Sequence, residues 1–314
     1  MTSKLARSLA LALVVVAGTG LTPSASAADK KIVIGVAVAN LQADFFNQIK
    51  QATEAYGKEK GIEIIAVDAK GDSATQVSQI QDLITRKIDA LIYIPAGATA
   101  AGVPVKAAKA AGIPVVNVDR NAADAPGDTF IATDSVAASK ALGDWICKAS
   151  GGKGKIGIIQ GQLGTTPEVD RDNGFNQALK NCPGLQVVAK QDSKMWMQDE
   201  GFAIAQDMLQ KHPDISIFYG RADALALGAA QAVKVANVGR KVFVIGFDGD
   251  VAGLKAVKSG TLDATATQVT QKMGRLAVES ALKLIKKEAV PPIQLQPATL
   301  TTKENVGPFI TNHP

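Results

Sequence analysis

The chain has few aromatic residues and only two histidines. Phe, Trp and Tyr together make up 4% of its 314 residues, whereas 46% are hydrophobic. A core of small aliphatic side chains suits helices packed closely on parallel sheets better than a β-sandwich. His212 and His313 lie in polar or Pro-flanked contexts, so the sequence offers no Cys/His metal set and no histidine-based triad.

The chain also lacks a basic run with interleaved aromatic residues. Its lysines are scattered over predicted helical faces, as at Lys50, Lys58 and Lys60. Binding to nucleic acid requires clustered positive charge, so no nucleic-acid partner is expected.

The N-terminus carries the order of segments that is typical of a secretory signal peptide. Lys4 and Arg7 precede an apolar run, Leu9–Ala17, which is too short to span a bilayer. Small residues follow, and cleavage is expected after Ala27. The apolar run is not followed by a cysteine that could accept a lipid. We therefore expect a free periplasmic protein with 32 basic and 29 acidic residues, a net charge of +3.

Two cysteines remain, Cys147 and Cys182, 35 positions apart within one predicted domain. In an oxidising compartment they can form a disulfide, and the alternative is a pair of free buried thiols. Either role is structural.

Short apolar runs alternate with amphipathic stretches from Lys31 onward, which predicts repeated βαβ units and parallel sheets. In the first half the predicted strands are Ile32–Ala39, Ile62–Val67, Ala90–Ile94 and Ile113–Val118. The predicted helices there are Phe45–Lys60, Ala74–Lys87 and Ala98–Ala111.

The same alternation restarts in the second half, where Ser135–Lys148 is the first predicted helix. The predicted strands are Ile156–Gln160, Leu185–Ala189, Ile215–Tyr219, Val242–Phe247 and Asp263–Val269. The predicted helices are Asp172–Asn181, Asp199–Lys211, Ala224–Val235 and 272–287. A final extended run, Ile293–Leu300, follows a Pro-Pro breaker, so the chain is expected to cross between two lobes more than once.

Two of the predicted strands end in a carboxylate. Val118 is followed by Asp119 and Arg120, and Phe247 is followed by Asp248. In open α/β sheets ligands bind outside the carboxyl ends of strands, so these two ends are expected to face one ligand.

Six short motifs, in this order and spacing behind the N-terminal segment, resemble the ribose-binding type of periplasmic sugar-binding protein over nearly the whole mature chain. They are Asp44-Phe45-Phe46, Val118-Asp119-Arg120-Asn121, Arg171-Asp172-Asn173-Gly174-Phe175, Ala224-Leu225-Ala226-Leu227-Gly228-Ala229, Gly246-Phe247-Asp248-Gly249 and Ala266-Thr267-Gln268.

The resemblance implies an α/β fold of two doubly wound parallel-sheet lobes joined by a three-crossover hinge, the type I periplasmic binding protein fold. It implies crossovers near Thr133, Gln268 and Gln296. The expected domains are a signal peptide (1–27), an N-terminal lobe (28–133 plus 269–296) and a C-terminal lobe (134–268 plus 297–314).

The resemblance also implies a non-enzymatic, monomeric binder without a cofactor, which closes on a sugar and delivers it to an ABC importer permease or presents it to a chemoreceptor. The ligand-binding residues that it implies are Phe45, Phe46, Asp119, Arg120, Arg171, Trp196, Asp248 and Gln268. Aromatic rings can stack on the C–H faces of a sugar, while carboxylates and guanidinium groups pair with its hydroxyls. Without the family, Phe45 and Phe46 would read as core residues, and Arg171 as part of a solvated ion pair.

Ala43 and Ala222 depart from the family pattern, which commonly has Asn at both positions. The loss of two amides puts ribose itself in doubt. Asn40, Gln160, Glu168 and Arg221 lie at or after predicted strand ends and are additional candidates. Two arginines balance Asp119 and Asp248, which favours a neutral monosaccharide or polyol. If Arg221 entered the site without Glu168, an acidic sugar would be favoured instead.

Two other functions compete with binding for transport. Asp119 and Asp248 could serve as the paired carboxylates of a secreted carbohydrate-active enzyme, although they lie on different mobile lobes. The effector domains of transcription repressors share this fold, but they follow a DNA-binding module, and a signal peptide stands in its place here.

Overall fold

The computed structural model describes residues 31–314. The predicted signal peptide, 1–27, and its cleavage point lie outside the described residues. No helix among residues 31–314 is long and apolar enough to cross a membrane.

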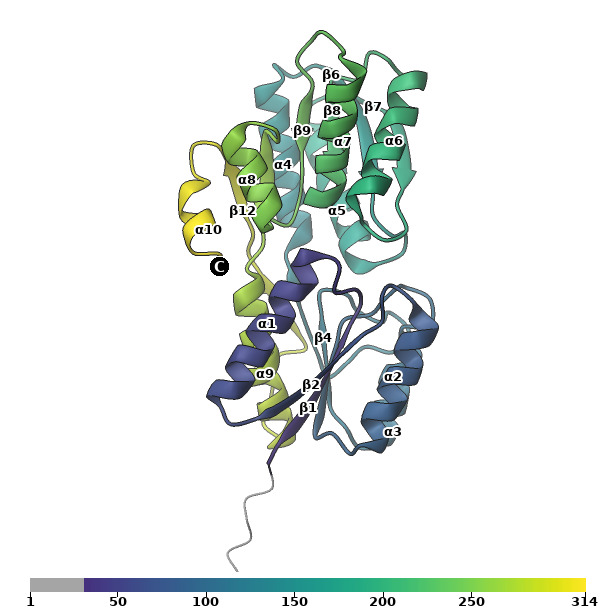
Figure 1. The fold of residues 1–314 in the computed structure, drawn as a ribbon, viewed down its shortest axis with the longest axis vertical. Coiled ribbons are helices and arrows are strands. Elements are labelled where there is room, and N and C mark those ends of the chain that lie inside the picture. The colour runs from purple at the N-terminus through teal and green to yellow at the C-terminus, as the bar shows by residue number, and fades with distance from the viewer. Residues whose placement is uncertain (1–30) are drawn as a thin grey trace, which may run out of the picture. The chain divides into compact units, whose positions relative to one another are not determined.

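The first lobe is built on a six-stranded parallel sheet with the strand order β11-β5-β4-β3-β1-β2. Its strands are β1 (Val33–Val38), β2 (Glu63–Asp68), β3 (Ala90–Tyr93), β4 (Val115–Val118), β5 (Thr129–Thr133) and β11 (Ile293–Gln296). One face is covered by α1 (Asp44–Glu59) and α9 (Thr270–Ile285), the other by α2 (Ser73–Thr85) and α3 (Gly102–Ala110) (Figure 1). Because both faces are covered, β3, β4 and β5 are buried throughout.

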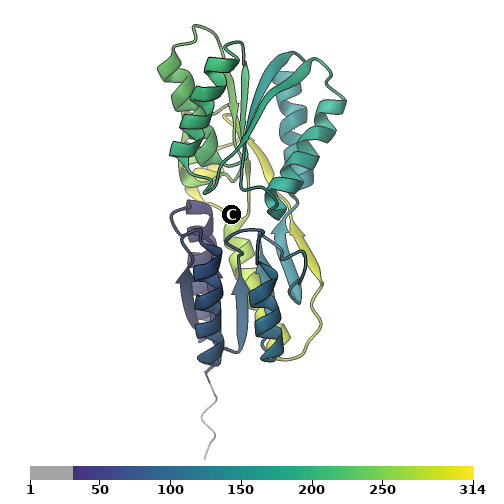
Figure 2. The ribbon, with the colours of Figure 1, turned by 90° about the vertical axis from the view of Figure 1, so that its right-hand side faces the viewer.

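The second lobe is built on another six-stranded sheet, with the order β12-β10-β9-β8-β6-β7. Its strands are β6 (Gly154–Gln160), β7 (Leu185–Asp192), β8 (Ile217–Gly220), β9 (Phe243–Ile245), β10 (Ala264–Thr267) and β12 (Thr299–Thr302). Its helices are α4 (Ser135–Ala149), α5 (Thr166–Lys180), α6 (Gln198–Lys211), α7 (Asp223–Ala236), α8 (Val251–Ser259) and α10 (Gly307–Thr311). The pair α4 and α5 covers one face, and α6, α7 and α8 cover the other (Figure 2).

Glycines let the paired helices of the second lobe approach closely. A Cβ atom on Gly174 of α5 would lie 2.1 Å from the carbonyl oxygen of Val136 in α4, and one on Gly228 of α7 would lie 2.2 Å from the carbonyl oxygen of Gln198 in α6. Such contacts leave no room for larger side chains. The low aromatic content therefore matches the packing.

The chain passes between the two sheets three times. It does so after β5, between β10 and α9, and between β11 and β12. The predicted fold class of two doubly wound lobes is confirmed, but β12 runs antiparallel to β10, so the second sheet is not wholly parallel. The residue boundaries of the predicted domains remain a prediction.

Several predicted elements differ from the observed ones. Helix α5 begins at Thr166, before the predicted start at Asp172, because Pro167 fits the first turn of a helix. The predicted run Ile293–Leu300 is divided into strands of different sheets, and β5, α8 and α10 were not predicted. Cys147 near the end of α4 forms a disulfide with Cys182 just after α5.

Candidate functional site

The two predicted carboxylates project from strand ends. Asp119 follows β4 and its backbone N–H donates to Ile131 of β5, while Asp248 follows β9 and its N–H donates to Ala266 of β10. Backbone pairing thus holds both residues in the sheets. Each nevertheless has a positive φ, 61° for Asp119 and 124° for Asp248, and Trp196 has 63°. Strained backbone of this kind clusters at functional sites, where surrounding contacts maintain it.

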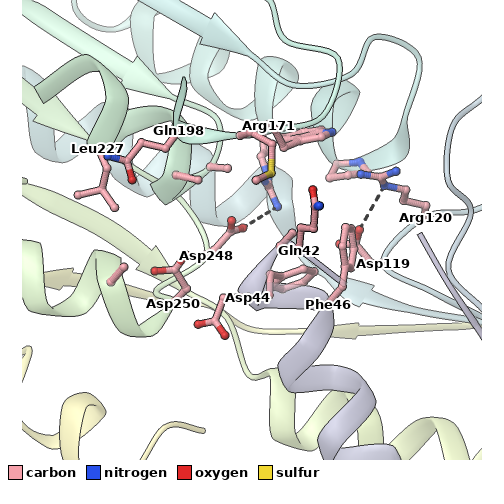
Figure 3. A pocket seen from close by; sticks show the side chains of 18 residues that line it. Gln42, Asp44, Phe46, Asp119, Arg120, Arg171, Gln198, Leu227, Asp248 and Asp250 are labelled. Atoms are coloured by element: carbon pink, nitrogen blue, oxygen red, sulfur yellow. Dashed lines mark hydrogen bonds and ion pairs between the residues drawn. The ribbon is translucent and has the colours of Figure 1, made fainter. Parts of the chain in front are cut away.

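Side chains of both lobes line a cavity of about 230 Å³. It is smaller than the ~300–1,000 Å³ of pockets that hold drug-sized molecules, which favours a small ligand. Of the eight residues that the resemblance implied, seven line it: Phe45, Phe46, Asp119, Arg120, Arg171, Trp196 and Asp248 (Figure 3). Ala43 and Ala222 line it from opposite lobes, so the two departures from the family pattern lie at the site.

On the first lobe, Asp119 and Arg120 form a buried ion pair. Asp119 Oδ2 lies 3.6 Å from Arg120 Nε, and Arg120 Nη1 donates to the carbonyl oxygens of Pro95 and Ala96, both at 3.0 Å. The guanidinium carbon of Arg120 lies 5.1 Å from the centre of the Phe46 ring. These contacts hold the guanidinium in one orientation and leave the Asp119 carboxylate as an acceptor at the cavity wall.

On the second lobe, Arg171 pairs with Asp248. Arg171 Nη2 lies 3.4 Å from Asp248 Oδ1, and the guanidinium carbon lies 3.8 Å from the centre of the Phe247 ring. Gln268 does not line the cavity. Its Nε2 donates to Asp248 Oδ1 at 2.8 Å, and its Oε1 accepts from Thr133 at the end of β5. Gln268 therefore links a pocket carboxylate to a chain crossing.

The two phenylalanines belong to the core and to the cavity at once. Phe45 and Phe46 are 7% and 6% exposed and pack in the core of the first lobe. Their rings meet edge to face, with 5.3 Å between the ring centres. Both also line the cavity, as does Trp196 from the second lobe. The core and the ligand-contact interpretations are therefore compatible.

The four additional candidates do not line the cavity. Asn40 borders a small neighbouring space, where its Oδ1 accepts from the backbone N–H of Gln42. Glu168 is buried against Gln160 and accepts from the backbone N–H of Gly161 at 2.7 Å, so both of these side chains hold the loop after β6.

Arg221 is fully buried and donates to Asp172 Oδ1 at 2.6 Å, with its guanidinium carbon 4.7 Å from the Tyr219 ring centre. Its side chain thus faces α5 and does not line the cavity. The condition that favoured an acidic sugar is therefore not met.

Sequence reasoning missed four polar residues of the cavity wall. They are Gln42, Asp44, Gln198 and Asp250. Asp44 directly precedes the two phenylalanines and Asp250 follows Asp248 by two residues, so proximity to recognised motifs was an available signal. The side chains of Asp44 and Asp250 point into the cavity because α1 begins at Asp44 and α8 begins directly after Asp250, and the sequence pattern did not predict α8.

Burial changes the acidity of the cavity carboxyls. It raises the pKa of Asp248 to about 7, against the opposing effect of Arg171, and nearby Asp250 and Asp119 raise it further. Burial likewise raises the pKa of Asp119, which Arg120 opposes, and the pKa of Asp250. A ligand that donates hydrogen bonds would stabilise the ionised forms. Within residues 31–314, no group of His, Cys, Asp and Glu side chains is arranged to hold a metal ion.

Comparisons with known proteins agree with this architecture. Residues 34–289 match the model of the periplasmic binding protein domain. The chain is 33% identical over 282 residues to the ribose import binding protein of Bacillus subtilis, covering 90% of this chain and 91% of that protein. It is 35% identical over 279 residues to the xylitol-binding protein of Mycolicibacterium smegmatis, covering 87% and 78%.

A solved structure is similar as well. It is an ABC transporter solute binding protein of Mycobacterium smegmatis with bound glycerol, with a TM-score of 0.85, 32% identity, and coverage of 89% of this chain and 97% of that one.

The fold and the cavity between its lobes define a two-lobed α/β solute-binding protein. The chain belongs to the family of periplasmic binding proteins, in the ribose-type group of substrate-binding proteins that serve ABC sugar importers.

Proposed function

We propose that the cavity binds a monosaccharide or a polyol of about the same size. The part of this ligand that carries the hydroxyl groups is uncharged. The observation that carries this proposal is the presence of two arginine–carboxylate pairs, Asp119 with Arg120 and Arg171 with Asp248, on opposite sides of one small cavity. Each pair offers an acceptor and a planar donor to vicinal hydroxyls. Phe46 and Trp196 supply apolar surface for the ring or chain carbons.

Contacts between the lobes support binding by closure. The backbone N–H of Asn121 donates to Thr166 Oγ1 at 3.0 Å, and Arg120 Nη1 lies 3.4 Å from Gln162 Oε1. Both contacts join the first lobe to the loop and helix that follow β6. A ligand that contacts both lobes would favour this arrangement over a separated one.

A thermal-shift screen with pentoses, hexoses and linear and cyclic polyols tests the proposal, followed by native mass spectrometry of each stabilising ligand. At least one ligand should raise the melting temperature and bind at a 1:1 ratio. The absence of stabilisation by any carbohydrate, with the protein shown to be folded by circular dichroism, would contradict it.

The proposal includes binding without turnover, since Asp119 and Asp248 are each held beside an arginine. Ligand recovered after prolonged incubation should be chemically unchanged, whereas an altered sugar would support the enzyme alternative.

The proposal also covers location and partners: the protein is a periplasmic monomer whose signal peptide is removed, and it delivers the ligand to a permease. A chemoreceptor is a second candidate partner. Pull-down with a permease against a receptor ectodomain separates the two.

A further inference from the structure

Two carboxylates of the cavity wall have no arginine partner. Asp119 pairs with Arg120, and Asp248 pairs with Arg171. The two arginines are the only cationic side chains among the residues that line the cavity. Asp44 and Asp250 line the same cavity, yet neither makes an ion pair within the described part of the chain. The lining thus has four carboxylates and two guanidinium groups, a formal charge of −2.

Asp44 and Asp250 lie close to each other although they belong to different lobes. Asp44 is the first residue of α1, and its Oδ2 accepts from Gln48 Nε2 at 2.9 Å and from the N–H of Val251, across the lobes, at 3.4 Å. Asp250 caps α8, with its Oδ1 accepting from the N–H of Gly253 at 2.6 Å. Figure 3 shows both carboxylates at the Asp248 end of the cavity, away from Asp119 and Arg120.

Helix capping accounts for part of this arrangement. The N-terminus of a helix favours a carboxylate, so each residue has a local structural role. Capping by Asp250 does not require that a second carboxylate, Asp44 from the other lobe, lie beside it in the same cavity. Burial raises the pKa of Asp250, and the nearby Asp44 raises it further, while His313 opposes the change. His313 itself is engaged with Gly249 O at 2.7 Å and with Thr270.

The same cavity contains buried donors without partners, which is a separate indication of a ligand. Arg171, 3% exposed, has no partner for its Nε, and Trp196, 8% exposed, has none for its indole N–H among residues 31–314. Both residues line the cavity. Buried donors are rarely left unpaired in a functional state, and hydroxyl oxygens would satisfy them. The cavity is therefore divided into a part that suits hydroxyls and an end that suits a positive charge.

We propose that Asp44 and Asp250 form a subsite for an ammonium group, so that the preferred ligand is an amino-substituted sugar or polyol. This inference rests on the proposed function, because the hydroxyls of that ligand would occupy the Asp119, Arg120 and Arg171 part of the cavity. An ammonium has three donors and one positive charge, and it would pair with two carboxylates that form no ion pair with an arginine or lysine among residues 31–314. Because each lobe supplies one carboxylate, the ammonium would contact both lobes upon closure.

Titration calorimetry with matched ligands tests this subsite. The panel is D-glucose, D-galactose and sorbitol, each beside its amino-deoxy counterpart, D-glucosamine, D-galactosamine and D-glucamine, and the N-acetylated form of each amine. At least one amine should bind about tenfold or more tightly than its neutral parent, a ratio that one charge-assisted hydrogen bond supplies. Acetylation, which removes the charge, should abolish the preference.

Asp44→Asn and Asp250→Asn keep the side-chain shape and one accepting oxygen, which in Asp250 caps α8, while they remove one charge each. Each should weaken amine binding about tenfold more than it weakens binding of the neutral parent. Asp72→Asn is the matched control, because Asp72 caps α2 in the same way, outside the cavity. This control should leave both affinities unchanged.

The possible outcomes separate the two proposals. If a neutral parent binds and every amine binds no more tightly than its parent, the ammonium subsite is refuted and the proposed function stands. If an amine is preferred but Asp44→Asn and Asp250→Asn do not reduce the preference, the assignment to these residues is refuted. If no compound of the panel or of the wider carbohydrate screen binds the folded protein, the proposed function itself fails.

Discussion

Replacing Asp119 with Asn should separate binding from folding. The substitution preserves the size of the side chain and removes its negative charge. Asn also tolerates the left-handed backbone of position 119, where φ is 61°. Alanine there would add about 1–2 kcal/mol of backbone strain, so Asp119→Asn isolates the chemistry more cleanly than Asp119→Ala.

The expected loss of affinity follows from the role of Asp119 as a charged acceptor. A hydrogen bond to a charged group contributes about 1.5–3 kcal/mol, and a carboxylate can accept from two vicinal hydroxyls. Losing both costs about 3–6 kcal/mol, which corresponds to about 100-fold to 20,000-fold in Kd. Since Asn retains one acceptor, we expect the loss of at least one of these hydrogen bonds, about 1.5–3 kcal/mol, which is at least about tenfold in Kd.

Folding stability should change little, because two opposing effects act on it. Asp119 is 5% exposed, and burial raises the pKa of its carboxyl, so ionisation opposes folding at neutral pH. Arg120 loses the ion pair at 3.6 Å but keeps its hydrogen bonds to Pro95 and Ala96. Removing the buried negative charge favours folding, whereas the buried Arg120 loses its counter-ion, so at about pH 7.5 the free energy of unfolding of the ligand-free variant should differ from the wild type by less than about 2 kcal/mol.

Titration calorimetry measures the affinity, and urea denaturation without ligand measures the stability. Asp124→Asn is the control, because Asp124 is exposed and pairs with Lys106 away from the cavity. Unchanged affinity would refute the assignment of Asp119 to the ligand. A loss of more than about 2 kcal/mol in ligand-free stability would show that its main role is structural.

Three further predictions concern stability. The pKa of Asp248, about 7 when folded and near 3.8 when unfolded, predicts that ligand-free stability falls as pH rises from about 4.5 to 7.5, and that Asp248→Asn flattens this slope in thermal melts. Replacing Cys147 and Cys182 with Ser should lower the free energy of unfolding by about 3–4 kcal/mol in urea titrations, because their disulfide closes a loop of 35 residues. Arg221→Met should lower the free energy of unfolding by about 1–3 kcal/mol, because it breaks the contact with Asp172. Its Kd for the ligand, measured by titration calorimetry, should be unchanged.

The alternation of apolar runs and helical stretches was sufficient to predict βαβ units and parallel sheets, whereas the two doubly wound lobes were implied by the family resemblance. Strands buried on both faces have continuous apolar sequences, and those of β3 and β4 were recognised for that reason. The short helix α8 and strand β5 were not predicted, since nine and five residues give little periodicity. The antiparallel direction of β12 depends on pairing with β10, which is distant in sequence.

The sequence by itself located Asp119 and Asp248 at the ends of predicted strands, because each follows a short apolar run of the kind that forms buried strands. Only the tertiary structure decided which polar side chains meet in the cavity. Arg221 follows a strand as Asp119 does, yet it turns toward Asp172, whereas Asp44 and Asp250 enter the cavity from the starts of two helices. The direction of a side chain depends on its local backbone and on its neighbours from distant segments. The charge of the site, and with it the proposed preference for an ammonium group, follows from that arrangement.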